Sequence, residues 1–255
     1  MQSNSFYLTL PSNSSMKIFP DNTLTRYNTK LYHRLEFRDE HEWEVALVEI
    51  HYPYSFYNVT STKCYILYRN DQQAPWTKIT LPGGYYEKPT DVLALINAHD
   101  KETNLHLRFQ PHVQRVATSV VDPTKKVQVQ FSSILMLLLG FNPDQDLNST
   151  RHARSKPDLQ QGFPAHMYVY TDIIHPQMVG DIVAPLLRIV NLNPAQHAFG
   201  SYGAHVFYSP HYIPLQKQNF DQLEIDLRDS TGDLIPFSFG RVNVKLHFRR
   251  RLTAS

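Results

Sequence analysis

The stretch Arg241-Val-Asn-Val-Lys-Leu-His-Phe248 decides the fold class of this chain. Successive side chains of a strand point to opposite faces, so the valines, Leu246 and Phe248 share one side and the polar residues share the other. A second alternating run, Leu223-Glu-Ile-Asp-Leu227, precedes the turn-rich segment 229–233. Two half-buried strands joined by a turn predict an antiparallel, all-β domain.

The composition is that of a globular protein. Of the 255 residues, 42% are apolar and 19% are charged, and tyrosine and phenylalanine number 15 and 14. A chain of this length buries a sizeable core, and abundant aromatic residues favour strands. The net charge of +2 is too small to indicate nucleic-acid binding by itself.

Three further features bear on the compartment. The single cysteine, Cys64, leaves no partner for an internal disulfide and no zinc site made of thiolates. The N-terminal residues lack a basic segment followed by an apolar core, so we expect no signal peptide. The longest apolar run, Ile134 to Leu139, is far too short to span a bilayer. We therefore expect a soluble intracellular product with no membrane partner.

Two helical segments interrupt the strand pattern in the middle of the chain. The apolar positions between Val92 and Ile96 fit one helical face, with Thr90 as the expected cap. Ser132 and Ser133 precede a short apolar helix that Gly140 stops. The segment 144–161 is polar and is expected to be an exposed loop leading out of this mixed region.

The remaining segments predict short strands. We expect them at Phe6–Leu10, Leu24–Leu35, Trp43–Ile50, Cys64–Tyr68, Leu105–Phe109, Lys126–Phe131, Met167–Thr171, Leu186–Val190, Val206–Ile213, Asp221–Leu227 and Val242–Arg249. This pattern predicts an all-β fold, a single jelly-roll sandwich with a small α/β insertion domain. The expected boundaries are 1–78 for the first part of the jelly roll, 79–161 for the insertion and 162–255 for the second part.

Motifs for catalysis or metal binding are weak in this sequence. Thirteen histidines occur, but the short patterns His-x-His and His-x-Asp/Glu of cupins and non-haem iron enzymes do not. Gly83-Gly84 lacks the residues of a phosphate loop, so it predicts a turn. Asp172 with His175 has no accompanying nucleophile motif. We expect no enzyme, no metal and no cofactor.

Two charged clusters have ordinary interpretations beside functional ones. The acidic series from Asp221 to Asp233 does not have EF-hand spacing, and its alternation with leucine and isoleucine predicts a solvated strand face rather than a calcium site. The basic cluster Arg249, Arg250 and Arg251 is a candidate for weak contact with nucleic acid, since phosphates need only cationic partners. A solvated tail is the alternative.

Landmarks along nearly the whole chain resemble one family. They are Phe6–Ser15, Phe19–Thr23, Glu42–Ile50 with Tyr52-Pro53, Leu81–Tyr85, the segment 93–97, Phe131-Ser-Ser, Leu138–Phe141, Tyr168–Asp172, Val179-Gly-Asp181, Pro185–Arg188, Leu223–Arg228 and Val242–Phe248. In this order and spacing they resemble the minor capsid (penton) proteins of Polinton (Maverick) elements, to which the vertex proteins of adintoviruses and virophages are related.

The resemblance implies a structural role without catalytic residues. It implies a jelly roll whose copies form a homopentamer at the five-fold vertices of an icosahedral shell, beside double jelly-roll major capsid subunits. The location it implies is the virion capsid vertex, after synthesis in the host cytoplasm or nucleus, and the source would be a viral or transposon-like element. The basic end of the chain would then be a candidate for facing packaged DNA.

A closed ring joins two different faces of each subunit, and interfaces favour tyrosine, phenylalanine and arginine. The aromatic segments around residues 52–57 and 199–212 are therefore candidate contacts, although the sequence leaves them equally open as core. The candidates are Tyr52, Tyr54, Phe56, Tyr57, Phe199, Tyr202, Phe207 and Tyr212. The alternative function is a lectin-like sandwich that binds a glycan or receptor through its loops, and a third is an enzyme on a β-sandwich.

Overall fold

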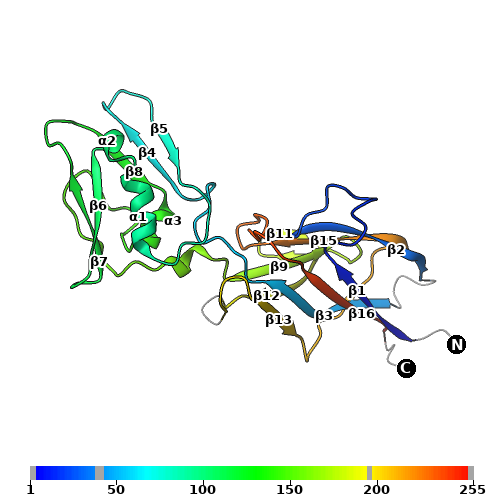
Figure 1. The fold of residues 1–255 in the computed structure, drawn as a ribbon. Coiled ribbons are helices and arrows are strands. Elements are labelled where there is room, and N and C mark those ends of the chain that lie inside the picture. Colours follow the sequence, from blue (N-terminus) through cyan, green and yellow to red (C-terminus); the bar gives the residue numbers. More distant parts are fainter. Residues whose placement is uncertain (1–3, 38–42, 194–196, 252–255) are drawn as a thin grey trace. The chain divides into compact units, whose positions relative to one another are not determined.

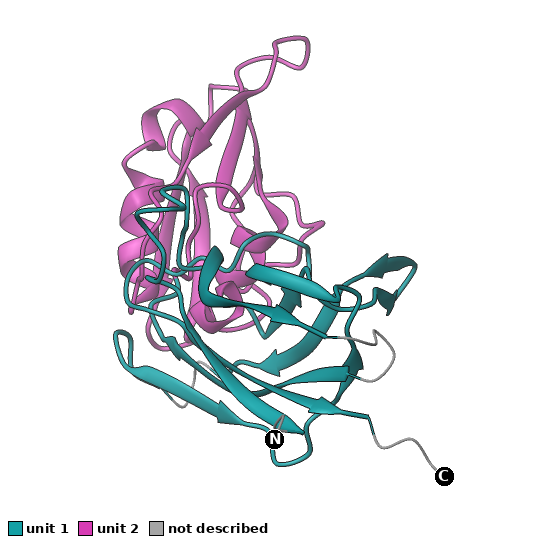
Figure 2. Ribbon diagram, turned by 90° about the vertical axis from the view of Figure 1, so that its right-hand side faces the viewer, with its two compact units in different colours: residues 1–56, 164–255 teal, residues 57–163 magenta. Residues whose placement is uncertain are grey.

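The structure, a computed structural model, describes residues 4–37, 43–193 and 197–251. The chain divides into two compact units (Figures 1 and 2). Unit 1 comprises residues 1–56 and 164–255, and unit 2 comprises residues 57–163. Unit 2 is therefore an insertion into the chain of unit 1.

Unit 1 contains two antiparallel sheets. The first, in the order β1-β16-β3-β13 with β14 also paired to β3, consists of β1 (Ser5–Pro11), β3 (Trp43–Pro53), β13 (Tyr202–Val206), β14 (Ile213–Pro214) and β16 (Asn243–Arg250). The second, in the order β12-β9-β15-β2, consists of β2 (Arg26–Glu36), β9 (His166–Thr171), β12 (Leu186–Asn191) and β15 (Asn219–Arg228). A separate hairpin, β10 (Gln177–Val179) with β11 (Ile182–Ala184), lies in the connection from β9 to β12.

The strand pairs of unit 1 are nested. The first strand, β1, pairs with the last, β16, and β2 pairs with β15. Inside these, β3 pairs with β13, and β9 pairs with β12. Such nesting is a long antiparallel hairpin rolled into two facing sheets, which is the jelly-roll arrangement. The predicted fold class is confirmed, with unit 2 inserted between β3 and β9.

The alternation that predicted β16 is the basis of the core. Val242, Val244, Leu246 and Phe248 are all fully buried. The ring of Phe248 stacks on that of Phe6 with 4.8 Å between centroids. It also lies 6.4 Å from the ring of Phe220, which belongs to the second sheet. The apolar face of β16 therefore fastens the two sheets together.

Unit 2 has its own sheets, helices and core. Its elements are β4 (Tyr65–Arg69), β5 (Thr77–Thr80), α1 (Pro89–Asn97), α2 (Asp100–Thr103), β6 (Leu105–Gln110), β7 (Arg115–Val120), β8 (Gln128–Phe131), α3 (Ser133–Leu138) and the 3₁₀ helix η1 (Leu159–Gly162). The strand order is β5-β4-β8 in one sheet, and β6 pairs with β7 in the other. A continuous cluster of buried apolar residues, among them Ile66, Ile96 and Leu135, fills the unit.

The first domain boundary differs from the expected one at residue 78. Strand β4 pairs with β5 on one side and with β8 on the other. Ile66, the second residue of β4, is fully buried in the unit 2 core. The segment 57–78 therefore belongs to the insertion, because its hydrogen-bond partners lie there.

Three local predictions also change. Helix α1 begins two residues earlier than a cap at Thr90 would place it, with Lys88 at the N-cap and Pro89 in the first turn, where proline needs no N–H partner. Ser132 is the N-cap of α3 as predicted, but its hydroxyl accepts from the Tyr65 N–H instead of capping the helix. The strand expected at Val206–Ile213 is wrong, because β13 ends at Val206 and β14 begins only at Ile213.

The end of α3 follows the prediction. Gly140 has a φ of +81°, and the N–H groups of Gly140 and Phe141 donate to the carbonyls of Leu137 and Met136. This is a Schellman motif, which needs the left-handed conformation that glycine adopts without strain. Within the described ranges, no helix is long and apolar enough to cross a membrane.

Candidate functional site

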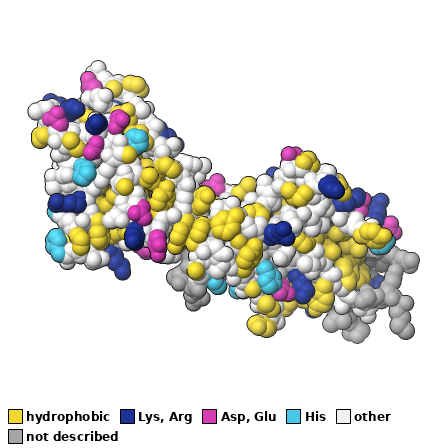
Figure 3. All heavy atoms as spheres, in the orientation of Figure 1, with side chains coloured by type: hydrophobic (Ala, Val, Ile, Leu, Met, Phe, Trp, Pro, Cys, Tyr) yellow, Lys and Arg dark blue, Asp and Glu magenta, His cyan; other side chains and the backbone are white. Residues whose placement is uncertain are grey.

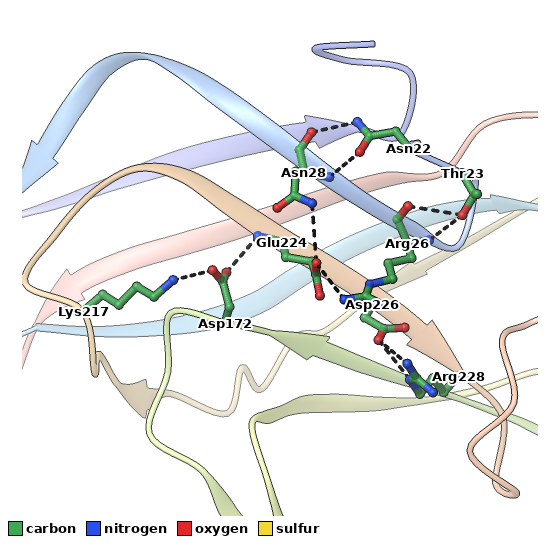
Figure 4. A network of polar contacts seen from close by, with 9 residues as sticks. All are labelled: Asn22, Thr23, Arg26, Asn28, Asp172, Lys217, Glu224, Asp226 and Arg228. Carbon is green, nitrogen blue, oxygen red and sulfur yellow. Dashed lines mark hydrogen bonds and ion pairs between the residues drawn. The ribbon is translucent and has the colours of Figure 1, made fainter. Parts of the chain in front are cut away.

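The outward face of the second sheet carries a network of polar side chains (Figure 4). Arg26 Nη2 lies 3.3 Å from Glu224 Oε2, across the β2–β15 pair. Along β15, Arg228 Nε and Nη2 donate to Oδ2 of Asp226 at 2.9 and 2.8 Å. The hydrogen bonds that Arg228 donates to Asp226 raise the pKa of the Arg228 guanidinium. The charges of this face are thus matched within the sheet.

Asp172 extends the network beyond the end of β9. Its carboxylate accepts hydrogen bonds from Lys217 Nζ and from the backbone N–H of Glu224. Asp221 binds Lys30 at 2.5 Å, and this bond lowers the pKa of the Asp221 carboxyl. The acidic side chains of β15 therefore form ion pairs and hydrogen bonds with cationic and amide groups of their own sheet, as the strand-face interpretation predicted.

The last two acidic residues of the series, Asp229 and Asp233, lie in the turn after β15. Asp229 Oδ1 accepts from the N–H and the hydroxyl of Thr231, at 2.8 and 2.6 Å, and from the N–H of Asp233 at 3.1 Å. A carboxylate that closes its own turn in this way is an ordinary turn device. Among the residues that the structure describes, no three His, Cys, Asp or Glu side chains gather where they would hold a metal ion.

A cavity of about 380 Å³ lies on the same face, between β9, β15 and the β10–β11 hairpin. Tyr170, Ile182 and Pro185 contribute apolar walls, and Asp226 contributes a carboxylate. Among the residues that the structure describes, none forms a hydrogen bond with the buried Oδ1 of Asp226. This oxygen can accept a hydrogen bond from a molecule in the cavity.

The β10–β11 hairpin exposes the most apolar surface near this cavity. Met178 is 88% exposed, Val183 69% and Ile182 56%. Monomeric proteins seldom place several large apolar side chains together in solvent, and such a group marks a contact surface. The sequence signal for the hairpin was Gly180-Asp181 between two apolar pairs, a glycine-containing two-residue turn.

The outward face of the first sheet carries aromatic and basic side chains, and Glu44 and Glu49 of β3 pair with Arg249 and Lys245 of β16. Tyr212 Oη lies 2.7 Å from His247 Nδ1, and the Tyr7 ring stacks on the same imidazole with 4.5 Å between ring centroids. The Arg249 guanidinium lies 3.4 Å from the centre of the Tyr212 ring. Burial, together with the charge of Arg249, lowers the pKa of His247. The two outer faces of the sandwich are thus chemically different.

The stability of the chain should depend on pH through His247. The pKa of this side chain is lower in the folded state than in the unfolded state. As the pH falls through about 6.5, the unfolded state therefore binds more protons than the folded state does. The contribution of His247 to stability is therefore present at pH 7.5 and is lost on acidification. We expect the free energy of unfolding to fall less between pH 7.5 and 5.5 in His247→Gln than in the wild type. Urea titrations at both pH values measure this. An equal fall in His247→Gln and in the exposed-site control His166→Gln contradicts the assignment.

The predicted contact residues divide into two groups by burial. Tyr52, Tyr54, Phe56 and Phe207 are buried within unit 1. For these four the core alternative holds, and burial also raises the pKa of Tyr52. Tyr57 and Tyr212 are half-buried, whereas Phe199 and Tyr202 are exposed. A contact role for these last four stays a prediction.

The basic cluster at the end of the chain is partly neutralised. Arg249 Nε lies 2.6 Å from Glu44 Oε1, and Arg251 Nε lies 3.9 Å from the other oxygen of the same carboxylate. Arg250 belongs to the last strand and donates its backbone N–H to Asn4. Figure 3 shows side chains of both charges interspersed with hydrophobic ones on the viewed face. Contact of these arginines with nucleic acid stays a prediction.

Comparison with known proteins finds similarity among solved structures. No protein-family model and no curated protein matches the sequence. Among solved structures, the chain is similar to the mavirus penton protein, known from a crystal structure of its SeMet-labeled form, with a TM-score of 0.49 and 12% sequence identity. The alignment covers 98% of this chain and 100% of that one. At this identity the similarity assigns no function to any residue.

Proposed function

We propose that this chain is a structural minor capsid (penton) protein that works by assembly. The proposal joins two findings from the chain itself. Its ordered motifs resemble the penton proteins of Polinton-type elements, and the residues that carry them fold as a jelly roll with one inserted unit. Jelly rolls recur in viral capsids. The proposed product is a homopentamer at the vertices of an icosahedral particle, without enzymatic activity.

The observation that carries the assembly role is the exposed apolar hairpin β10–β11. Met178 and Val183 are largely exposed to solvent, next to a cavity that is lined by the Asp226 carboxylate. A ring interface is heterologous, so it needs two different surfaces on each subunit. The polar second sheet with its hairpin, and the aromatic and basic first sheet, supply two such surfaces.

We expect Met178→Asp with Val183→Asp to prevent ring formation while the subunit stays folded. A charge at each exposed apolar position must be desolvated on association but costs little in the free subunit. Light scattering across low micromolar concentrations compares this variant with the wild type. The matched control is Val113→Asp with Val121→Asp, which adds the same charge at two exposed apolar positions of unit 2. Rings that survive the double substitution contradict the role of the hairpin.

The proposed function itself is tested by co-expression with a double jelly-roll major capsid protein from the same element. Electron microscopy should show five-fold rings or capsomers at particle vertices. Rings alone do not separate this function from a lectin-like one, because lectins also form rings. Particles that assemble without this chain at their vertices, together with a monomer at every concentration, would overturn the proposal.

A further inference from the structure

Three lysines from two separate segments of unit 2 line one cavity. Lys101 belongs to helix α2, and Lys125 and Lys126 precede β8. The cavity has a volume of about 410 Å³. We call it the lysine pocket; its other walls include Tyr68, Asn70 and Glu102.

Asn104 holds the two lysine-bearing segments together. This buried residue ends α2 with a φ of 55°. Its side chain donates to the carbonyl of Asp122 and accepts from the Asp122 N–H, both at 2.8 Å. Asp122 in turn accepts from the N–H and hydroxyl of Thr124, which closes the turn just before Lys125. The backbone beneath the lysines is therefore fixed before any ligand arrives.

The positive charge of the lysine pocket is available for a ligand. Within the described part of the chain, Lys101, Lys125 and Lys126 form no ion pair with an acidic side chain. The Asp122 carboxyl lies within range of Lys125, because the hydrogen bonds from Thr124 and, to a smaller extent, the charge of Lys125 lower its pKa. The nearby Arg69 differs, because its guanidinium is engaged by Gln128 at 2.6 Å and by the face of Trp76. Ammonium groups gathered around a concave surface repel one another and concentrate anions there.

We propose that the lysine pocket binds a sulfated glycan. The lysines supply compact positive charges for sulfate groups. The half-buried Tyr68 ring offers a flat apolar surface for a sugar ring. Asn70 and Glu102, both exposed, supply a donor and acceptors for sugar hydroxyls. This site lies wholly within the insertion and goes beyond the vertex role, so it stands whether or not the chain assembles.

Two features of the pocket favour a glycan over nucleic acid. The Glu102 carboxylate lines the same cavity; it repels sulfate and phosphate alike, but it accepts hydrogen bonds from sugar hydroxyls, which the interior of a DNA duplex does not offer. The cations also converge on one cavity, whereas binding of a nucleic-acid strand uses a groove of charge that follows the backbone. Nucleic acid is therefore the competing outcome of the test.

The test is calorimetric titration of the full chain with a heparin-derived octasaccharide, at 50 and 150 mM NaCl. We expect binding that weakens at the higher salt and becomes at least about tenfold weaker in the variant Lys101→Gln, Lys125→Gln, Lys126→Gln. The matched control is Arg108→Gln, Arg115→Gln, Lys156→Gln. It removes the same charge from exposed positions of the same unit outside the pocket. We expect the control to stay within about twofold of the wild type.

Three outcomes would overturn the proposal. The first is equal loss of binding in both triple variants, which would mean attraction by net charge alone. The second is tighter binding of a DNA duplex of equal charge than of the octasaccharide. The third is no binding of the octasaccharide at 50 mM NaCl. Circular dichroism of each variant confirms that the unit is folded.

Discussion

Replacing Phe248 with alanine is expected to lower the free energy of unfolding by about 3–5 kcal/mol. The side chain is fully buried and stacks on Phe6 from the neighbouring strand β1. Its ring centroid also lies 6.1 Å from that of Phe37 and 6.4 Å from that of Phe220. Alanine would therefore leave a cavity at the point where the two sheets of the sandwich meet. Urea unfolding at a fixed protein concentration measures the loss.

The matched control is Tyr208→Ala, since Tyr208 is almost fully exposed. We expect it to change stability by less than about 0.5 kcal/mol. A second variant, Phe248→Leu, keeps part of the apolar volume and should lose less than Phe248→Ala. Equal losses in Phe248→Ala and Tyr208→Ala would contradict the placement of β16 at the centre of the core.

Replacing Gly162 with alanine is expected to destabilise unit 2 by more than about 3 kcal/mol. A Cβ at this position would lie 1.9 Å from the carbonyl oxygen of Asn58, which is backbone and cannot rotate away. Asn58 is itself held by Tyr86, whose N–H it accepts at 2.9 Å and whose carbonyl it binds at 2.8 Å. The first and last segments of the insertion thus touch at a point where only glycine fits. Hydrogen exchange of β4 and α1, compared with β15, measures where the stability is lost.

Gly83→Ala is the control for Gly162→Ala. A Cβ at residue 83 meets no atom closer than 3.7 Å, an ordinary contact distance. We expect amide protection in unit 2 to be nearly unchanged by this substitution. If the amides of β4 are equally protected from exchange in Gly162→Ala and in Gly83→Ala, the two ends of the insertion are not packed as the structure places them.

The candidate surfaces were only partly predictable. The sequence marked Tyr52, Tyr54 and Phe56 as aromatic but could not tell core from surface, because they fall at the end of β3 and just beyond it, where simple alternation stops. The structure buries all three. The exposure of the apolar hairpin at Met178 and Val183 could not be predicted from its short segment, because it depends on no other described element of the chain packing over it. The lysine pocket depends on Asn104, which joins segments about twenty residues apart.

By itself, the sequence determined the elements whose pattern is local. The alternation of β16, the glycine stop of α3 at Gly140 and the strand face of β15 each follow from backbone geometry and side-chain periodicity over a few residues. Tertiary structure alone decided the placement of β4 in the insertion and the partners of Arg249 and Asp172. Those outcomes rest on hydrogen bonds and ion pairs between distant segments, here Ile66 with Phe131 and Glu44 with Arg249. No short window of sequence contains both partners of such a contact.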